Sequence, residues 1–245
     1  MIEHKIYRYK KLKSTNSKTA ELQAIERLPE FSVVITSKQI AGRGLLNNAW
    51  ESENNKNLTF SMVLYPKFIE VQNQFTLTFV VSVAISDVLK KYIPNIRIKW
   101  PNDIYYGDKK MTGILIENTI IGNKILYSIV GIGVNVNQTK FISDAPNPTS
   151  MKLLTGIEFD TEKLLNDIID AIIFRYNQCE MGGFENIYKE YHDRLYRIGE
   201  EHCFRDKTGN FKGQIIKVEK TGHLVIIDSE NKQKRYSLNE IRFFI

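Results

Sequence analysis

The stretch Lys99-Trp100-Pro101-Asn102-Asp103 lies between two runs of β-forming residues, and Lys110 and Gly113 follow it closely. Proline lacks an amide hydrogen and fixes φ, so Pro101 excludes a continuous central strand at this point. The polar groups are therefore predicted to lie where a strand breaks, aimed outward from a rigid frame. Because a solvated turn rarely needs Trp-Pro beside lysine, the stretch indicates a site for an anionic group. A plain Lys/Asp surface turn is the alternative.

Patterns of helix and strand extend from this stretch in both directions. Residues 75–92 carry apolar side chains on nearly every side, which predicts a buried helix, and the spacing over 164–176 predicts an amphipathic one. Two further helices are expected, at 18–28 before Pro29 and at 187–195. Strands are expected at 6–9, 31–36, 57–65, 96–100, 113–117 and 125–136, the last three in one sheet. The fold class is therefore α/β (α+β), a mixed sheet with flanking helices.

The composition changes near Ile198-Gly199. Beyond this point, short alternating runs are separated by turn signals at 208–210, 221–223 and 228–231. About 45 residues of short strands indicate a small β-barrel appended to the α/β domain. We therefore expect two domains, at residues 1–197 and 198–245.

The overall composition, 42% hydrophobic and 25% charged in 245 residues, is that of a globular protein. The formal charge of +6 favours anionic partners, but acidic residues are spread along the chain, so nucleic-acid binding is not favoured as the main role. No apolar run reaches the length of a membrane span, and no signal-peptide core opens the chain. With Cys179 and Cys203 far apart, we expect no metal site from cysteines and a cytoplasmic location.

Two polar clusters precede the opening stretch. Ser14-Thr15-Asn16 comes before a predicted helix, which it is suited to cap, and its hydroxyls and amide also suit a small polar ligand. Gln39-Ile40-Ala41-Gly42-Arg43-Gly44 follows a predicted strand. Its glycines allow a ligand to approach the backbone closely, and Arg43 offers a bidentate fork to phosphate. A simple helix cap and a flexible surface loop are the alternatives.

A fourth cluster, Gly131-Ile132-Gly133-Val134-Asn135-Val136-Asn137, ends a long apolar strand. Glycines inside a strand indicate a bulge or close approach, but the third glycine and the helix of a dinucleotide fingerprint are missing. Asn135 is suited to hydrogen-bond a base or ribose, or to cap a turn.

In the opening stretch, a lysine ammonium is suited to stabilise negative charge that develops on a phosphate or carboxylate. The carboxylate of Asp103 is suited to bind Mg²⁺.

In this order and spacing, with Trp50 downstream of Gly-Arg-Gly, the four clusters resemble the biotin–protein ligase family. The resemblance spans almost the whole chain, and Lys-Trp-Pro-Asn-Asp is its most specific part. It implies a catalytic domain like that of class II aminoacyl-tRNA synthetases, followed by an SH3-like β-barrel. Long members carry an N-terminal DNA-binding domain. Because Ser14 lies near Met1, the chain resembles the short form, and no DNA binding is expected.

The resemblance implies a reaction in two steps. Biotin and ATP form biotinyl-5′-AMP and pyrophosphate, and a lysine of a biotin carboxyl carrier protein then takes the biotinyl group and releases AMP. ATP and Mg²⁺ are the implied cofactors, and no membrane partner is expected. Lipoate or octanoate ligases and transferases of the same fold, and a non-catalytic nucleotide- or nucleic-acid-binding module, are the competing hypotheses. Whether the chain forms a homodimer is left open.

The resemblance also implies roles for residues that match its motifs. Lys110 and Arg43 are the implied catalytic residues, and Asp103 is an implied ligand of Mg²⁺. The implied biotin-binding residues are Ser14, Thr15, Asn16, Gln39, Gly42, Arg43, Gly44, Leu45, Lys110 and Gly113. The implied ATP-binding residues are Trp50, Lys99, Asn102, Asp103 and Asn135.

One segment departs from the family pattern. Members commonly continue Gly-Arg-Gly with more arginine and glycine, whereas here Leu45-Leu46-Asn47-Asn48-Ala49 leads to Trp50. The length of the loop is kept, so its backbone role survives, but a second arginine to clamp phosphate is missing. We hypothesise that the adenylate is held less firmly, or that Leu45 and Leu46 cover it by packing instead.

Overall fold

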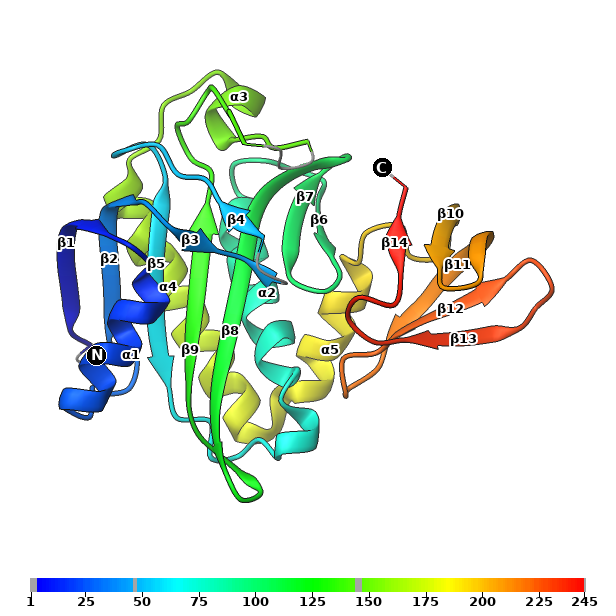
Figure 1. Cartoon of the computed structure of the whole chain (residues 1–245), viewed down its shortest axis with the longest axis horizontal. Coiled ribbons are helices and arrows are strands. Elements are labelled where there is room, and N and C mark those ends of the chain that lie inside the picture. Colours follow the sequence, from blue (N-terminus) through cyan, green and yellow to red (C-terminus); the bar gives the residue numbers. More distant parts are fainter. Residues whose placement is uncertain (1–3, 46–47, 144–146, 245) are drawn as a thin grey trace.

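The structure is a computed structural model that describes residues 4–45, 48–143 and 147–244. A seven-stranded mixed sheet with the order β1-β2-β5-β9-β8-β7-β6 forms its centre (Figure 1). Only β1 and β2 run parallel, and the other neighbours are antiparallel. The strands are β1 (Ile6–Leu12), β2 (Val33–Gln39), β5 (Leu58–Leu64), β6 (Ile96–Lys99), β7 (Asp103–Tyr106), β8 (Lys109–Ile121) and β9 (Lys124–Val134).

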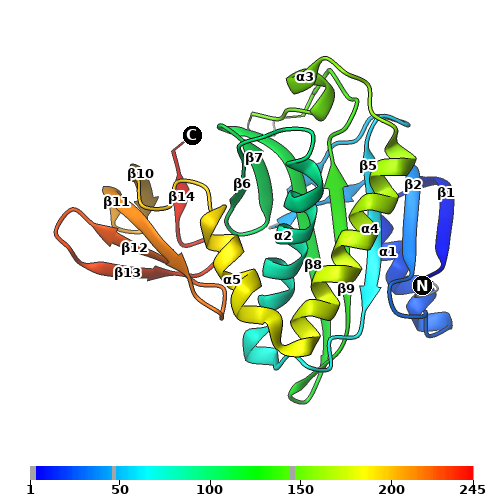
Figure 2. The ribbon, with the colours of Figure 1, turned by 180° about the vertical axis from the view of Figure 1, so that it is seen from behind.

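Helices cover the two faces of this sheet unequally. α2 (Thr76–Leu89) and α4 (Thr161–Gln178) lie together on one face (Figure 2). α1 (Thr15–Ile25) packs on the other face, against β2, β5 and β9. A small hairpin of β3 (Gly42–Arg43) and β4 (Ala49–Trp50) lies on that same face (Figure 1). The second face is therefore left partly open, and the candidate site lies there.

The helix α2 is apolar all round because it lies inside the core. Every residue of α2 except Asp87 is buried, since the helix packs between the sheet and the helices α4 and α5 (Phe184–Asp193). α4 instead buries one stripe, which includes Leu165, Ile168 and Ile172. The predicted buried and amphipathic helices are both confirmed.

The strand break predicted at Pro101 is also confirmed. β6 ends at Lys99, and the chain returns as β7 from Asp103, which pairs directly with Lys99. β7 is too short for the sequence pattern to reveal. Asp103 also pairs with Gly113 of β8, so these three residues form a row across neighbouring strands.

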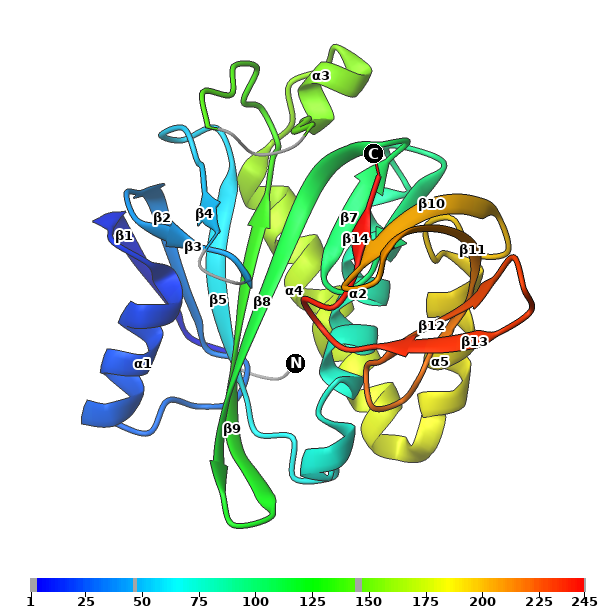
Figure 3. The same cartoon turned by 45° about the vertical axis from the view of Figure 1, so that its right-hand side comes forward.

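The C-terminal residues form a second sheet where the sequence predicts short strands, and we call this part the C-terminal domain. Its five strands are antiparallel, in the order β13-β12-β11-β10-β14. In Figure 3, β14 overlaps β7 in projection, and the ring of Phe243 on β14 lies 4.5 Å from the ammonium of Lys99 at the end of β6. Trp100 Nε1 donates a hydrogen bond of 2.9 Å to the carbonyl oxygen of Gly222, which ties the two parts together. The strands are β10 (Glu201–Asp206), β11 (Gly209–Val218), β12 (Leu224–Asp228), β13 (Gln233–Tyr236) and β14 (Arg242–Phe243).

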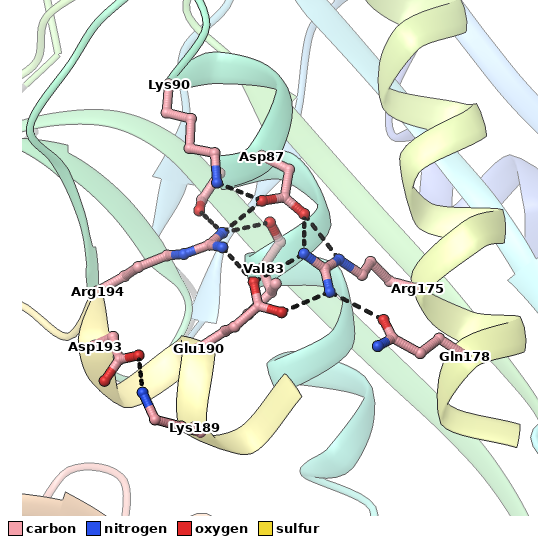
Figure 4. A network of polar contacts seen from close by, with 10 residues as sticks. Val83, Asp87, Lys90, Arg175, Gln178, Lys189, Glu190, Asp193 and Arg194 are labelled. Carbon is pink, nitrogen blue, oxygen red and sulfur yellow. Dashed lines mark hydrogen bonds and ion pairs between the residues drawn. The ribbon is translucent and has the colours of Figure 1, made fainter. Parts of the chain in front are cut away.

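A closed network of charges joins α2, α4 and α5 behind the sheet (Figure 4). Asp87 accepts hydrogen bonds of 2.8 Å from Arg175 and from Arg194. Glu190 pairs with the same two arginines. Arg194 also carries the carbonyl oxygen that accepts the amide of Ile98 at 2.8 Å, so the network reaches the edge of β6.

Other elements are short and were not expected from the sequence pattern. They are η2 (Val71–Asn73), α3 (Met151–Thr155) and the π-helical turn η3 (Cys179–Gly183), in which Gly182 has a φ of +88°. Within the described ranges, no helix combines the length and apolar character that a membrane span requires.

Candidate active site

A cleft of about 880 Å³ opens on the sheet face that carries α1 and the β3–β4 hairpin. Most of the residues predicted for the site line this one cleft. They are Ser14, Thr15, Asn16, Gln39, Arg43, Gly44, Leu45, Trp50, Lys99, Asn102, Asp103, Lys110 and Gly113. Gly42 and Asn135 do not line it, and Leu46 and Asn47 lie outside the described residues.

The Ser-Thr-Asn cluster both starts a helix and forms one wall of the cleft. Ser14 is the N-cap of α1 and accepts a hydrogen bond from the Ser17 amide at 3.4 Å. The amide of Thr15 donates to Oε1 of Gln39 at 2.8 Å, and Thr15 Oγ1 lies 2.8 Å from Oγ of Ser61. Cap and pocket therefore coexist, because the cap uses Ser14 while the next side chains turn toward the sheet.

The glycines of the fourth cluster make room for protein side chains. A Cβ at Gly131 would lie 2.3 Å from Oδ1 of Asn16, and one at Gly133 would lie 2.3 Å from Cε2 of Trp50. A Cβ at Gly113, which pairs with Gly133, would lie 3.0 Å from the same ring. The indole of Trp50 therefore rests on two paired glycines at the floor of the cleft. Its Nε1 has no partner within residues 4–45, 48–143 and 147–244.

The β3–β4 hairpin explains why Gly42 matters although it does not line the cleft. Gly42 pairs with Trp50, and a Cβ there would lie 2.5 Å from Nε2 of Gln39 and 2.6 Å from the Trp50 carbonyl oxygen. Only glycine fits between these groups. Gly42 thus shapes the hairpin that carries Arg43 and Trp50 into the cleft wall.

The strand break holds the strongest charge pair of the cleft. Lys110 Nζ lies 2.7 Å from Oδ1 of Asp103, and both side chains are largely buried. The same ammonium lies 5.8 Å from the ring of Trp50. Asn102 is fixed against β8, because its Nδ2 donates to the Ile114 carbonyl oxygen at 2.5 Å and its own carbonyl oxygen accepts the Ile114 amide at 3.0 Å. The site therefore presents a positioned cation above rigid backbone.

Lys99 lies at the end of β6, on the other side of Asp103 from Gly113. Burial lowers the pKa of Lys99. The nearby charge of Asp103 raises this pKa, whereas the positive charges of Lys110 and Arg197 lower it further. Its ammonium lies 5.2 Å from the ring of Tyr105 and 4.5 Å from the ring of Phe243. The lysine therefore joins the strand break to the C-terminal domain.

The C-terminal domain contributes a wall that the sequence analysis did not assign to the site. Leu238, Asn239, Ile241, Arg242 and Phe243 all line the cleft. No sequence motif marks them, because their position depends on how the two domains pack. Arg242 is the one with fixed positive charge, and it also borders a second hollow on the surface of that domain.

Asn135 is buried beneath the cleft. Its amide donates to the Met111 carbonyl oxygen at 3.0 Å, and its carbonyl oxygen accepts the amide of Met151 at 3.0 Å. Its Oδ1 has no partner in the described part of the chain. Asn135 thus links the end of β9 to the start of α3, next to the segment that carries Lys110.

Arg43 makes its contacts with a residue that the sequence analysis passed over. Its Nη2 lies 3.1 Å from Oε1 of Glu117 on β8. Glu117 Oε2 also accepts a hydrogen bond of 2.7 Å from Asn16. An acidic residue inside a predicted strand gave no signal of its own, although the two-residue period from Gly113 places it on the cleft face.

The cleft offers few carboxylates that could bind a metal ion. Within the described residues, no three side chains among His, Cys, Asp and Glu gather as a metal cage, and Asp103 is the one carboxylate that lines the cleft. One of its oxygens is already paired with Lys110. This donor set suits a cation carried mainly by phosphate oxygens rather than one bound by protein alone.

Comparisons with known proteins agree with this geometry. Residues 9–135 match the biotin/lipoate A/B protein ligase family. The bifunctional ligase/repressor BirA of Bacillus subtilis is 30% identical over 97% of this chain and 73% of its own length. The biotin–[acetyl-CoA-carboxylase] ligase of Paracoccus denitrificans is 28% identical over 91% of this chain and 95% of its own.

Among solved structures, the biotin protein ligase from Aquifex aeolicus in complex with biotin and ATP superimposes with a TM-score of 0.81. It is 25% identical in sequence, and the match covers 98% of this chain and 99% of that one. The likeness includes the large sheet and the C-terminal β-domain together. The chain belongs to the biotin/lipoate A/B protein ligase family.

Proposed function

We propose that this chain is an ATP-dependent biotin–protein ligase, which makes biotinyl-5′-AMP and transfers the biotinyl group to a lysine of a carboxyl carrier protein. The observation that carries the proposal is that one cleft is lined by the polar side chains of Ser14 and Gln39, by the ring of Trp50 and by the Lys110–Asp103 ion pair. The relatives named as biotin ligases support biotin as the acyl substrate. We extend the proposal to a cytoplasmic location, where ATP and carrier proteins are available.

The first step brings two anions together. An oxygen of the biotin carboxylate bonds to the α-phosphorus of ATP, and the bond from that phosphorus to the bridging oxygen of pyrophosphate breaks. Lys110 offsets the charge that both reactants carry, because its ammonium is held at 2.7 Å from Asp103 and needs no reorganisation. Arg43 adds a second positive charge from the β3–β4 hairpin.

The nucleotide is expected on the side of the cleft that both domains share. Asn102 and Lys99 approach it from the strand break, and Arg242 approaches it from β14. The ring of Trp50 offers an apolar face near Lys110. We propose that Arg242 supplies part of the positive charge toward phosphate that the Leu45-Leu46 segment lacks.

Mg²⁺ is implied by the family and suits this site as a partner of ATP. Asp103 would hold it through the oxygen that Lys110 does not occupy, together with phosphate oxygens. Bound there, the ion would neutralise phosphate charge. Asp103 itself keeps the ammonium of Lys110 in place.

In the second step, a carrier lysine attacks as a neutral amine. Its nitrogen bonds to the acyl carbon of biotinyl-5′-AMP and gives up one proton to solvent, and the bond from that carbon to the phosphate oxygen breaks and releases AMP. Lys110 can stabilise the oxygen that becomes negatively charged during the attack. The carrier lysine belongs to another protein, so it must enter the cleft from solvent.

The proposal is tested by incubating the purified chain with Mg²⁺, ATP and either biotin, lipoate or octanoate, and detecting the acyl-AMP by mass spectrometry. We expect biotinyl-5′-AMP and pyrophosphate only with biotin. Lipoyl- or octanoyl-AMP would instead indicate a lipoate-type ligase of the same family. ATP-independent acyl transfer would indicate an octanoyl transferase, and no product with any acid would contradict an enzymatic role.

A further inference from the structure

The ion pair between Arg43 and Glu117 lies at the edge of the cleft and has no role in the reaction described so far. Arg43 Nη2 lies 3.1 Å from Oε1 and 3.3 Å from Oε2 of Glu117, and 3.5 Å from Oγ of Ser17. Glu117 is four residues beyond Gly113 on β8, so both project from the same face of the strand. Arg43, which lines the cleft, is therefore held by a carboxylate of β8 that lies just outside the cleft lining.

The same carboxylate orients Asn16. Asn16 Nδ2 donates to Glu117 Oε2 at 2.7 Å and to the Leu115 carbonyl oxygen at 3.2 Å, while its Oδ1 accepts from Ser61 Oγ at 2.6 Å. With both ends of its amide bonded, Asn16 has one orientation. Glu117 thus joins the β3–β4 hairpin to the first turn of α1.

The two contacts of Glu117 differ in strength. Asn16 is buried, whereas the side chains of Arg43 and Glu117 are 49% and 39% exposed. Ion pairs exposed to this degree are weak, whereas an arginine bound to phosphate by two charge-assisted hydrogen bonds is held more strongly. A phosphate in the cleft can therefore take Arg43 away from Glu117 while Asn16 stays in place.

We propose that Glu117 is a positioning residue that acts as the exchangeable counter-ion of Arg43. In the empty protein it holds the arginine, and with it the β3–β4 hairpin, against β8. It releases the arginine to the phosphate of the bound acyl-adenylate. The inference rests on the proposed function for the identity of that adenylate, but the ion exchange itself requires only a phosphate.

The hairpin offers phosphate a single basic side chain, so the exchange of that side chain affects how firmly phosphate is held. From Gly42 to Trp50, Arg43 is the only basic residue. No neighbouring arginine in that segment can bind phosphate while Arg43 stays with Glu117. The competition between the carboxylate and the phosphate for one guanidinium therefore contributes directly to how long the adenylate is retained.

The Glu117→Gln variant separates the two contacts, because its amide oxygen still accepts from Asn16 while its charge is gone. Preformed biotinyl-5′-AMP should leave this variant about 3- to 5-fold more slowly than wild type, the scale of an exposed ion pair. The effect should vanish when Arg43→Gln is already present. Glu162→Gln is the matched control, because Glu162 forms an exposed ion pair with Arg8 outside the cleft.

A purely structural role for Glu117 predicts a different result. Release from Glu117→Gln would then be unchanged or faster, and equally so with Arg43→Gln present, which would overturn the proposal. A titration with AMP in a calorimeter tests the exchange without any reaction. Glu117→Gln should bind AMP about 3-fold more tightly than wild type, and equal or weaker binding would contradict the exchange. Absence of biotinyl-5′-AMP formation by wild type would contradict the proposed function alone.

Discussion

The two faces of the large sheet carry charged clusters of opposite character. On the helix-covered face, Arg175 and Arg194 each contact both Asp87 and Glu190, and the two arginine side chains are only 12% and 16% exposed (Figure 4). On the cleft face, Lys110 pairs with one carboxylate and the half-exposed Arg43 with another. Where every charge has several partners, the cluster holds helices together. Where a cation has a single, accessible partner, it is free to meet an anionic substrate.

The largest expected effect comes from breaking the closed network. Asp87→Asn removes one of the two carboxylates that both arginines share, so that Arg175 and Arg194 keep only Glu190 as a charged partner; breaking these two buried ion pairs should cost about 3 kcal/mol of the free energy of unfolding. Urea denaturation measures this loss. Activity per folded molecule should stay at the wild-type level, because the network lies on the far face. The exposed Asp170 of α4 offers Asp170→Asn as a control, which should change the stability little.

If Asp87→Asn unfolded at the wild-type urea concentration, the network would not be structural. If it stayed folded but lost adenylation, the separation between the two faces would be wrong. In that case the hydrogen bond from Ile98 to Arg194 would be the route by which the network reaches the strand break.

At Lys110, in the cleft, the main effect should be on the rate of the reaction. Lys110→Ala should lower the rate of adenylate formation by about 100-fold or more, the scale for loss of one preorganised charge. Because Lys110→Ala also leaves the largely buried carboxylate of Asp103 without its partner, the free energy of unfolding should fall as well, and the rate is compared per folded molecule. Rates of biotin-dependent pyrophosphate release measure the first effect. Lys109→Ala is the matched control on the neighbouring exposed lysine. A wild-type rate in Lys110→Ala would refute the assignment.

The hairpin loop should respond more moderately. Leu45 lines the cleft, so Leu45→Arg restores a second cation there and should slow release of biotinyl-5′-AMP by about 10-fold through charge-assisted contacts. Leu126→Arg on the exposed β8–β9 hairpin controls for the added charge. Unchanged or faster release from Leu45→Arg would show that the leucine retains the adenylate by packing.

The smallest effect is a pH dependence of stability. Burial opposes ionisation of Asp87, but Lys90, Arg175 and Arg194 outweigh it and lower its pKa below the ordinary value of 3.8. The ionised carboxylate therefore contributes its full stability above that value, and the contribution is lost as the pH falls through 3.8 toward the folded pKa. The stability difference between wild type and Asp87→Asn should shrink from pH 6 to pH 3. A constant difference would contradict the lowered pKa.

Much of the fold follows from local physical chemistry. Apolar residues on every side of 75–92 require a helix inside the core, and Pro101 requires a strand break; both are present. The four polar clusters also meet in one cleft, because they lie at the ends of neighbouring elements on one sheet face.

What the sequence could not supply depends on contacts between distant residues. The glycines at 113, 131 and 133 indicate close approach, but only the fold shows that Asn16 and Trp50 fill the space. Likewise, the packing of Trp100 on Gly222 brings the C-terminal wall to the cleft, and no motif in residues 238–243 announces it.

The central claim is that the single-partner cations of the cleft serve biotin transfer. Its most direct test is the intact mass of a biotin carboxyl carrier domain after incubation with the chain, biotin, ATP and Mg²⁺. We predict the mass gain of one biotinyl group on one lysine, dependent on ATP and lost with Lys110→Ala but kept with Asp87→Asn under folding conditions. An unchanged carrier mass with the wild-type chain, or a gain that survives Lys110→Ala at the wild-type rate, would contradict the account.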